Sequence, residues 1–336
     1  MFRSKKFLFT MIVVLLTMMT VVGCGTNGEQ EKTNADLKKP EESPEETRII
    51  QHAMGETKIT GTPVRIVTLY QGATDVAIAF GIKPVGIVES WVEKPVYKYL
   101  RDDLEGVPIV GLETQPNLEE IAKLKPDLII ASKLRHEKVY EQLSQIAPTV
   151  THDTVFKFKE TVELMGKAMN MEEKANELLA DWDNRVVDFK QQISAKLGND
   201  WPIEVSVLNF RTDHARIYVT GFAGDILGEL GFVRPESQQK AAEEGNVVLK
   251  LTTKESIPSM NADVFFIFNT DGHNPDAEAI QRTYEEWTNH PLWENLDAVK
   301  NNQTYIVDET AWNMGGGYIS ANNMLDQIFE HFKLEK

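Results

Sequence analysis

The feature that most constrains the fold of this 336-residue chain is an unbroken stretch from about Met171 to Leu197. Apolar residues recur along it at steps of four, four, three, four and four, which places them on one face of an α-helix. These residues are Leu178, Trp182, Val186, Phe189, Ile193 and Leu197. At about 1.5 Å per residue the helix is roughly 40 Å long, enough to span two lobes. The pattern predicts a linker helix over residues 171–198.

Short apolar runs alternate with helix-like segments on both sides of this stretch. The strand-like runs are 65–69, 85–88, 108–110 and 127–131 before it, and 205–208, 217–219, 262–268 and 304–307 after it. Strands that alternate with helices pair in parallel and carry helices on both faces of the sheet. We therefore expect the α/β class, with an N-terminal lobe over 51–170, a C-terminal lobe over 199–336, and a ligand held between them.

The first 24 residues have the order of a lipoprotein signal. A basic start, from Arg3 to Lys6, precedes an apolar run over 7–22 that is too short and too early to be preferred as a spanning helix. The run ends at Gly23 and Cys24, the only cysteine of the chain, and resembles the bacterial lipobox. We expect residues 1–23 to be a signal peptide and Cys24 to anchor the protein outside the cytoplasm, on the bacterial cell membrane. The alternative is an ordinary signal peptide with an incidental cysteine.

Composition separates the next segment from the rest of the chain and excludes several functions. Residues 24–50 hold almost no apolar side chains, so they cannot offset their ordering entropy and should form a disordered tether. The formal net charge of −16 argues against nucleic acid as a partner and against attraction to anionic lipid. The sequence has no phosphate-binding glycine loop, serine elbow or HExxH motif, so we expect no enzymatic activity.

The segment over 111–130, GLETQPNLEEIAKLKPDLII, resembles the signature of siderophore, haem and cobalamin binding proteins of ABC importers. The similarity extends over residues 60–336, and FRTDHARIY, over 210–218, is most similar to the ferric-siderophore branch. The resemblance implies the helical-backbone periplasmic-binding-protein fold of class III type. It also implies delivery of a ferric siderophore to an ABC permease dimer with a cytoplasmic ATPase. We expect the protein to be a monomer that needs no cofactor of its own.

The same resemblance implies one acidic permease contact on each lobe. By motif position these contacts are Glu119 and Glu255, where paired surface charges would orient the protein on the permease. The alternative is that each is a first-turn glutamate favoured by the helix dipole.

A binding protein for an iron chelate recognises the outside of a complex whose metal is already coordinated, so no direct metal ligand is expected. Arginine meets carboxylate oxygens with two hydrogen bonds, and aromatic rings pack on the organic part of the chelate. Such side chains follow the predicted strands. They are Tyr70, Gln71, Trp91, Thr114, Gln115, Lys133 and Arg135 in the first lobe, and Arg211, His214, Arg216, Tyr218, Asn269, His273, Trp312, Asn313 and Tyr318 in the second.

Arg135 and Arg211 are the principal candidates among these residues. Arg216 has the alternative of pairing with Asp213, and Trp312 that of a core indole. The glycines over 315–317 are expected to let the backbone approach a ligand closely.

Two further ligand classes stay open. Haem or cobalamin carriers share the fold, and Tyr70, Tyr318 or His214 could hold haem iron. Direct capture of zinc or manganese needs converging ligands, whereas the seven histidines are scattered without an i,i+4 pair. An anionic citrate or citrate–hydroxamate complex of iron uses the arginines better than a neutral trihydroxamate does. It is therefore the expected ligand.

Overall fold

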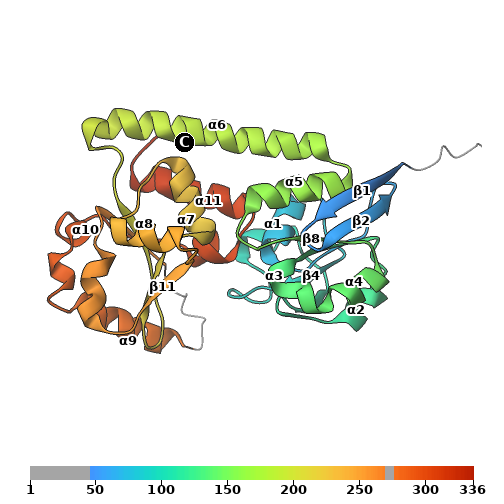
Figure 1. Ribbon diagram of the computed structural model, residues 1–336, viewed down its shortest axis with the longest axis horizontal. Helices are drawn as coiled ribbons and strands as arrows, with labels where there is room; N and C mark the ends of the chain where they lie inside the picture. Colours follow the sequence, from blue (N-terminus) through green and yellow to red (C-terminus); the bar gives the residue numbers. More distant parts are fainter. Residues whose placement is uncertain (1–45, 269–275) are drawn as a thin grey trace, which may run out of the picture. The chain divides into compact units, whose positions relative to one another are not determined.

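The structure, a computed structural model, describes residues 46–268 and 276–336, which form two α/β lobes joined by a long helix (Figure 1). The predicted signal peptide and Cys24 lie outside these residues, as do the candidates Asn269 and His273. None of the helices in the described ranges is long and apolar enough to cross a membrane.

The folded part begins earlier than expected. Strand β1 (Thr47–His52) pairs with β2 (Gly55–Thr60) in an antiparallel hairpin, and Ile50 and Ile59 are buried against the first lobe. The predicted tether boundary at residue 50 is therefore wrong by a few residues. Each strand thus turns one isoleucine toward the lobe, while most of its other side chains are polar and stay at least partly exposed.

The first lobe is built on a six-stranded sheet in the order β6-β5-β4-β3-β7-β8. All of its strands run parallel except β6, which forms a short antiparallel pair with β5. The strands are β3 (Ile66–Thr68), β4 (Gly86–Glu89), β5 (Ile109–Leu112), β6 (Gln115–Pro116), β7 (Leu128–Ser132) and β8 (Thr149–His152). Successive strands extend outward from β3 to β5 and then from β7 to β8, so the strand order reverses between β3 and β7. Ligands of open α/β sheets bind at such a reversal.

The described part of the first lobe also contains helices. They are α1 (Gln71–Ala79), α2 (Leu118–Lys123), α3 (Lys133–His136), α4 (Tyr140–Ile146) and α5 (Phe158–Met169). Asn117 precedes α2 and its side-chain oxygen accepts from the backbone N–H groups of Glu119 and Glu120, at 3.1 and 3.2 Å. This side chain satisfies two of the unpaired N–H groups of the first turn, as the sequence predicts.

Helix α6 (Glu172–Leu197) is the predicted linker and lies along both lobes in Figure 1. Five residues of the apolar stripe are buried, and Leu197 at the end of the helix is half-buried. Trp182 packs edge-on against Phe158 of α5 at 4.9 Å between ring centroids, and Phe189 packs against Phe232 and Phe329 of the second lobe. One apolar core therefore continues from the first lobe through α6 into the second.

The second lobe has a five-stranded sheet in the order β11-β10-β9-β12-β13. Strands β9, β12 and β13 are parallel, as expected, whereas β10 is antiparallel to both of its neighbours. The strands are β9 (Val205–Phe210), β10 (Ala215–Tyr218), β11 (Val248–Leu251), β12 (Val264–Ile267) and β13 (Thr304–Ile306). The helices are α7 (Gly221–Leu230), α8 (Glu236–Glu243), α9 (Ala277–Thr288), α10 (Asp297–Lys300) and α11 (Tyr318–His331). Helix α7 ends at Gly231, whose φ of +97° needs a residue without a Cβ.

The start of α11 is fixed to the first lobe by a buried carboxylate. Asp75 of α1 accepts hydrogen bonds from the backbone N–H groups of Ile319 at 2.7 Å and Ser320 at 2.9 Å, and from the Tyr99 hydroxyl at 2.7 Å. A Cβ at Gly317 would lie 2.3 Å from that carboxylate. This glycine therefore serves close packing between α1 and the segment before α11, whereas it was expected to serve the approach of a ligand.

Candidate ligand-binding site

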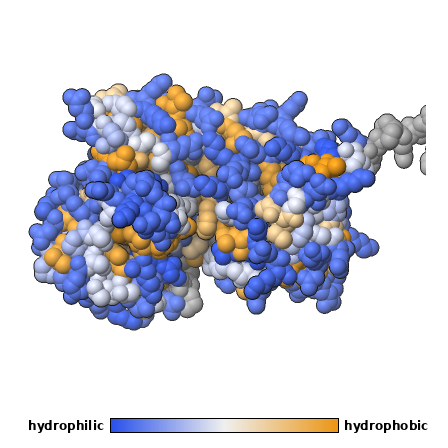
Figure 2. All heavy atoms as spheres, in the orientation of Figure 1, coloured by the Kyte–Doolittle hydropathy of each residue, from blue (hydrophilic) through white to orange (hydrophobic). Residues whose placement is uncertain are grey.

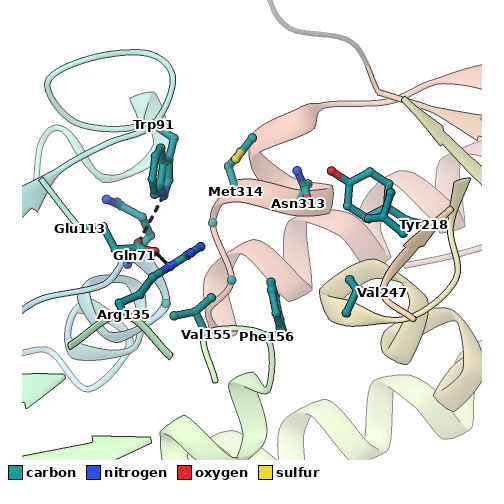
Figure 3. Close-up of a pocket in the computed structure, with 14 residues that line it drawn as sticks. Gln71, Trp91, Glu113, Arg135, Val155, Phe156, Tyr218, Val247, Asn313 and Met314 are labelled. Atoms are coloured by element: carbon teal, nitrogen blue, oxygen red, sulfur yellow. Dashed lines mark hydrogen bonds and ion pairs between the residues drawn. The ribbon is translucent and has the colours of Figure 1, made fainter. Parts of the chain in front are cut away.

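A pocket of about 310 Å³ lies between the two lobes. Its lining residues come from both of them, as Figure 3 shows: Gln71, Gly72, Trp91, Glu113, Arg135, Val155, Phe156, Tyr218, Val247, Val248, Asn313, Met314, Gly315 and Gly316. On the face drawn in Figure 2 the surface is mostly hydrophilic, with apolar residues in patches, one of them where the lobes meet below α6. The volume is at the lower end of the range for small-molecule sites.

The first lobe presents the carboxyl end of every parallel strand to this pocket. Gln71 follows β3, Trp91 follows β4, Glu113 follows β5, Arg135 follows β7, and Val155 follows β8. Because parallel strands all end at the same edge of the sheet, residues far apart in sequence are gathered here.

Glu113 connects the polar groups of this half of the pocket. Its side chain is only 3% exposed, and its Oε1 accepts from Nε of Arg135 at 3.0 Å. Its Oε2 accepts from the indole N–H of Trp91 at 3.3 Å and from the backbone N–H of Gln71 at 3.2 Å. Burial raises the pKa of the Glu113 carboxyl, and the adjacent Arg135 guanidinium opposes that rise.

The backbone of Glu113 is also held in place. Burial lowers the pKa of His136 to about 4, so its ring is neutral at physiological pH. In the tautomer that satisfies both contacts, Nδ1 accepts from the Ser132 N–H at 3.1 Å, and Nε2–H donates to the Glu113 carbonyl at 2.8 Å. This ring therefore ties the end of β7 to the end of β5.

The second lobe contributes aromatic, aliphatic and amide groups on the opposite side. Tyr218 ends β10 and lies beside Val247, while Asn313 and Met314 come from the short helix after β13 (Figure 3). The wall of the pocket is thus charged on the first lobe and uncharged on the second.

A larger, more open pocket of about 730 Å³ lies at the other end of the second sheet. Its lining includes Ile203, Asp263 and Gln303, which precede β9, β12 and β13, together with the end of α6. It contains no residue of the first lobe. Because ligands of α/β sheets bind at the carboxyl ends of the strands, we take the smaller pocket between the lobes as the candidate site.

Three of the predicted contact residues belong to the core and do not line the pocket. Tyr70 is fully buried and its hydroxyl bonds to Thr161 at 3.1 Å. Trp312 is fully buried against Phe266 and donates to Gln327 at 3.0 Å, which is the core-indole alternative. Tyr318 is buried, with its hydroxyl on Asp181 of α6 at 2.8 Å.

The basic candidates of the second lobe and Lys133 do not line the pocket. Arg216 donates from Nε to Nε2 of the buried His214 at 3.0 Å, and Nδ1 of His214 contacts Asp213 at 2.5 Å. Arg216 is thus connected to Asp213 through the histidine ring and not by direct pairing of the two side chains, which was the expected alternative. Arg211 lies on the same hairpin, and its backbone N–H donates a hydrogen bond to the His214 carbonyl. His214 is thus a support for Arg216, whereas it was expected to contact the ligand.

Gln71, Trp91 and Arg135 are the predicted residues that the pocket brings together, with Tyr218 and Asn313 opposite them. Glu113 was missed, although it follows the strand over 109–112 by one residue and the same strand-end signal points to it. An acid was not expected where an anion should bind.

The two predicted permease contacts are exposed on separate lobes. Glu119 lies in the first turn of α2 and contacts Lys123 at 3.1 Å. Glu255 lies in the first turn of the 3₁₀ helix over Lys254–Met260. Within 46–268 and 276–336, no group of three or more histidine, cysteine and acidic residues is arranged to hold a metal ion.

Two lobes, one linking helix and a pocket between them define a solute-binding protein. The model of the periplasmic binding protein family matches residues 66–311, and the chain belongs to this family. The predicted fold, two α/β lobes on a helical backbone, is confirmed.

The names of similar proteins agree with the predicted ferric-siderophore branch of the family. The "Achromobactin-binding periplasmic protein" of Dickeya dadantii is 49% identical over 267 residues, which are 79% of this chain and 85% of that protein. The "Probable siderophore-binding lipoprotein YfiY" of Bacillus subtilis is 41% identical over 333 residues, 98% of both chains. The crystal structure of Staphylococcus aureus SirA complexed with staphyloferrin B has 53% identity and a TM-score of 0.83, covering 86% of this chain and 99% of that one. The first two are named as binding proteins, and the third was solved in complex with staphyloferrin B.

Proposed function

We propose that this protein captures an anionic ferric siderophore of the citrate or citrate–hydroxamate type outside the cytoplasm and delivers it to an ABC importer. The observation that carries the proposal is Arg135, which lines the pocket between the lobes with its side chain 30% exposed. Its Nε is bonded to Glu113, and no acceptor is found for its two terminal nitrogens within the described part of the chain. A carboxylate of the chelate can accept two hydrogen bonds from these two terminal nitrogens.

The aromatic groups support the same ligand class. Trp91 is 42% exposed on one side of the pocket, and Tyr218 lies on the other. Rings on both sides suit the organic part of a metal chelate. The haem alternative relied on Tyr70, Tyr318 or His214, each of which is buried outside the pocket.

Titration of the purified protein with ferric chelates tests this proposal, with the indole fluorescence of Trp91 as the reporter. We expect saturable quenching by a ferric citrate-type chelate. Binding of a neutral ferric trihydroxamate or of haem should be at least tenfold weaker, a difference of about 1.4 kcal/mol. Iron-free chelator and uncomplexed ferric iron are the controls.

The Trp91→Phe variant should lose most of the quenching and keep most of the affinity measured by calorimetry, which identifies the reporter. Tighter binding of haem or of the trihydroxamate than of every carboxylate chelate would refute the proposed ligand class.

The proposal includes attachment to the membrane and a single-chain binding site. Cys24 would carry the lipid, an assignment supported by the lipobox-like sequence and by the word lipoprotein in the name of YfiY. Because one chain supplies both walls of the pocket, a monomer suffices for binding.

Glu119 and Glu255 are proposed to dock the two lobes on the permease dimer. In cells that carry the cognate permease, Glu119→Gln combined with Glu255→Gln should reduce chelate uptake at least tenfold. Chelate affinity should not change, because neither residue lines the pocket. The matched control is Glu163→Gln with Glu335→Gln, which removes one exposed acid from each lobe. Full uptake by the first double variant would eliminate these contacts.

A further inference from the structure

A buried acid lies in the pocket that is proposed to take an anion. Among the described residues that line the pocket, only Glu113 and Arg135 are charged, and their formal charges cancel. A site that attracted its ligand by net charge alone would be stronger without the carboxylate. Glu113 must therefore contribute something other than charge.

The contacts of Glu113 show what it contributes. One carboxylate oxygen holds Nε of Arg135, and the other holds the indole N–H of Trp91. Since a guanidinium group is planar, a hydrogen bond at Nε restricts the plane in which the two terminal nitrogens lie. The guanidinium carbon of Arg135 is 5.8 Å from the centre of the Trp91 ring, close enough for a cation–π contact.

The carboxylate is itself rigid, because it cannot turn without losing partners. The carboxylate also accepts a hydrogen bond from the Gln71 N–H at the first turn of α1. The backbone carbonyl of Glu113 accepts another from the His136 ring. In Figure 3 the Arg135 side chain extends from this cluster toward the space between Trp91 and Val155.

We infer that Glu113 is a positioning residue that fixes the Arg135 fork and the Trp91 ring, so that the site selects a chelate by the geometry of its carboxylate group rather than by its net charge. This inference rests on the proposed function and names the feature of the ligand that the first lobe recognises. A ferric tris-catecholate, which carries high negative charge without a free carboxylate, should gain little from such a site.

The Glu113→Gln variant separates positioning from charge, because the two effects have opposite signs. The substitution makes the pocket more positive, so simple electrostatics predicts tighter binding of every anion. Positioning predicts weaker binding of ferric citrate, by about tenfold. The amide NH₂ group would face one of the three N–H groups from which the carboxylate now accepts hydrogen bonds. Arg135 would then lose the charged acceptor that orients its guanidinium group. Binding of a ferric tris-catecholate should stay equal or become tighter, so the ratio of the two affinities should fall at least tenfold.

Glu89→Gln is the matched control. Glu89 ends the neighbouring strand β4 and pairs with Lys94 at 2.6 Å, but it does not line the pocket. This variant removes the same charge nearby and should leave both affinities within about twofold of the wild type. The thermal unfolding midpoint checks that each variant is folded.

A second substitution keeps the inference testable if Glu113→Gln does not fold. Arg135→Lys preserves the charge but replaces the fork with one ammonium, which would pair with Glu113. We expect it to bind ferric citrate as weakly as Arg135→Ala does. Wild-type affinity in Arg135→Lys, or unchanged or tighter citrate binding in Glu113→Gln, would overturn the inference and leave the proposed function standing. Absence of ferric chelate binding by the wild type would refute the proposed function and the inference with it.

Discussion

Replacing Trp182 with alanine is expected to lower the free energy of unfolding by about 3–5 kcal/mol. Trp182 is fully buried in the middle of α6, where it packs on Phe158 of the first lobe. Phe158 in turn contacts Phe222 of α7 in the second lobe. The substitution therefore opens a cavity in the core that α6 shares with both lobes, and these rigid elements have little freedom to collapse into it.

Urea denaturation followed by circular dichroism measures this loss, and Val187→Ala is the control. Val187 lies on the same helix and is 53% exposed, so its substitution should change stability by no more than about 0.5 kcal/mol. A loss below about 1 kcal/mol for Trp182→Ala would mean that α6 does not join the two lobes through a common core.

Arg135→Ala is expected to weaken binding of a ferric carboxylate chelate by at least about 2 kcal/mol, or roughly 30-fold. The variant removes the only cation among the described pocket-lining residues and the donor fork for the ligand. It also leaves the buried Glu113 carboxylate without its charged partner and facing an anion. Fluorescence or calorimetric titration gives the two dissociation constants.

Two control substitutions accompany this variant. Lys138→Ala removes one positive charge three residues further along the chain, from an exposed position outside the pocket. Arg211→Ala removes a cation that the sequence favoured equally but that does not line the pocket. Both should weaken binding less than threefold. Equal effects of all three substitutions would mean that the ligand senses only the general charge of the protein.

The fold was predictable because periodicity reports which faces of an element are buried. The apolar stripe on α6 and the runs that became β7, β9 and β12 required no knowledge of tertiary contacts. The hairpin of β1 and β2 and the antiparallel pairing of β10 were not predicted. Strands of four to six residues with polar faces carry little periodic signal. The sequence of a single strand also does not reveal whether the strand pairs in parallel or antiparallel with its neighbours.

The site was half predictable, and two pairs of neighbours show why. Tyr70 is buried while Gln71 lines the pocket, and Trp312 is buried while Asn313 lines it. The end of a strand locates such a pair, but adjacent side chains point in different directions. In both pairs the larger apolar ring occupies the core and the amide remains at the pocket. Chemical suitability for a ligand favoured the rings, whereas the free energy of burial decided their position.

Glu113 was overlooked for a related reason. The chemistry of an anionic ligand directs attention to cations, yet a cation in a rigid site needs a partner that orients it. That partner is visible only once the strand ends of β5 and β7 are placed side by side at the same edge of the sheet.

A crystal structure of the protein with a ferric citrate-type chelate, with iron located by its anomalous scattering, tests the central claim most directly. We predict the complex between the lobes, with a carboxylate about 3 Å from the terminal nitrogens of Arg135 and with the rings of Trp91 and Tyr218 against it. A chelate bound elsewhere, such as at the amino ends of β9, β12 and β13, with Arg135 free of it, would contradict the account.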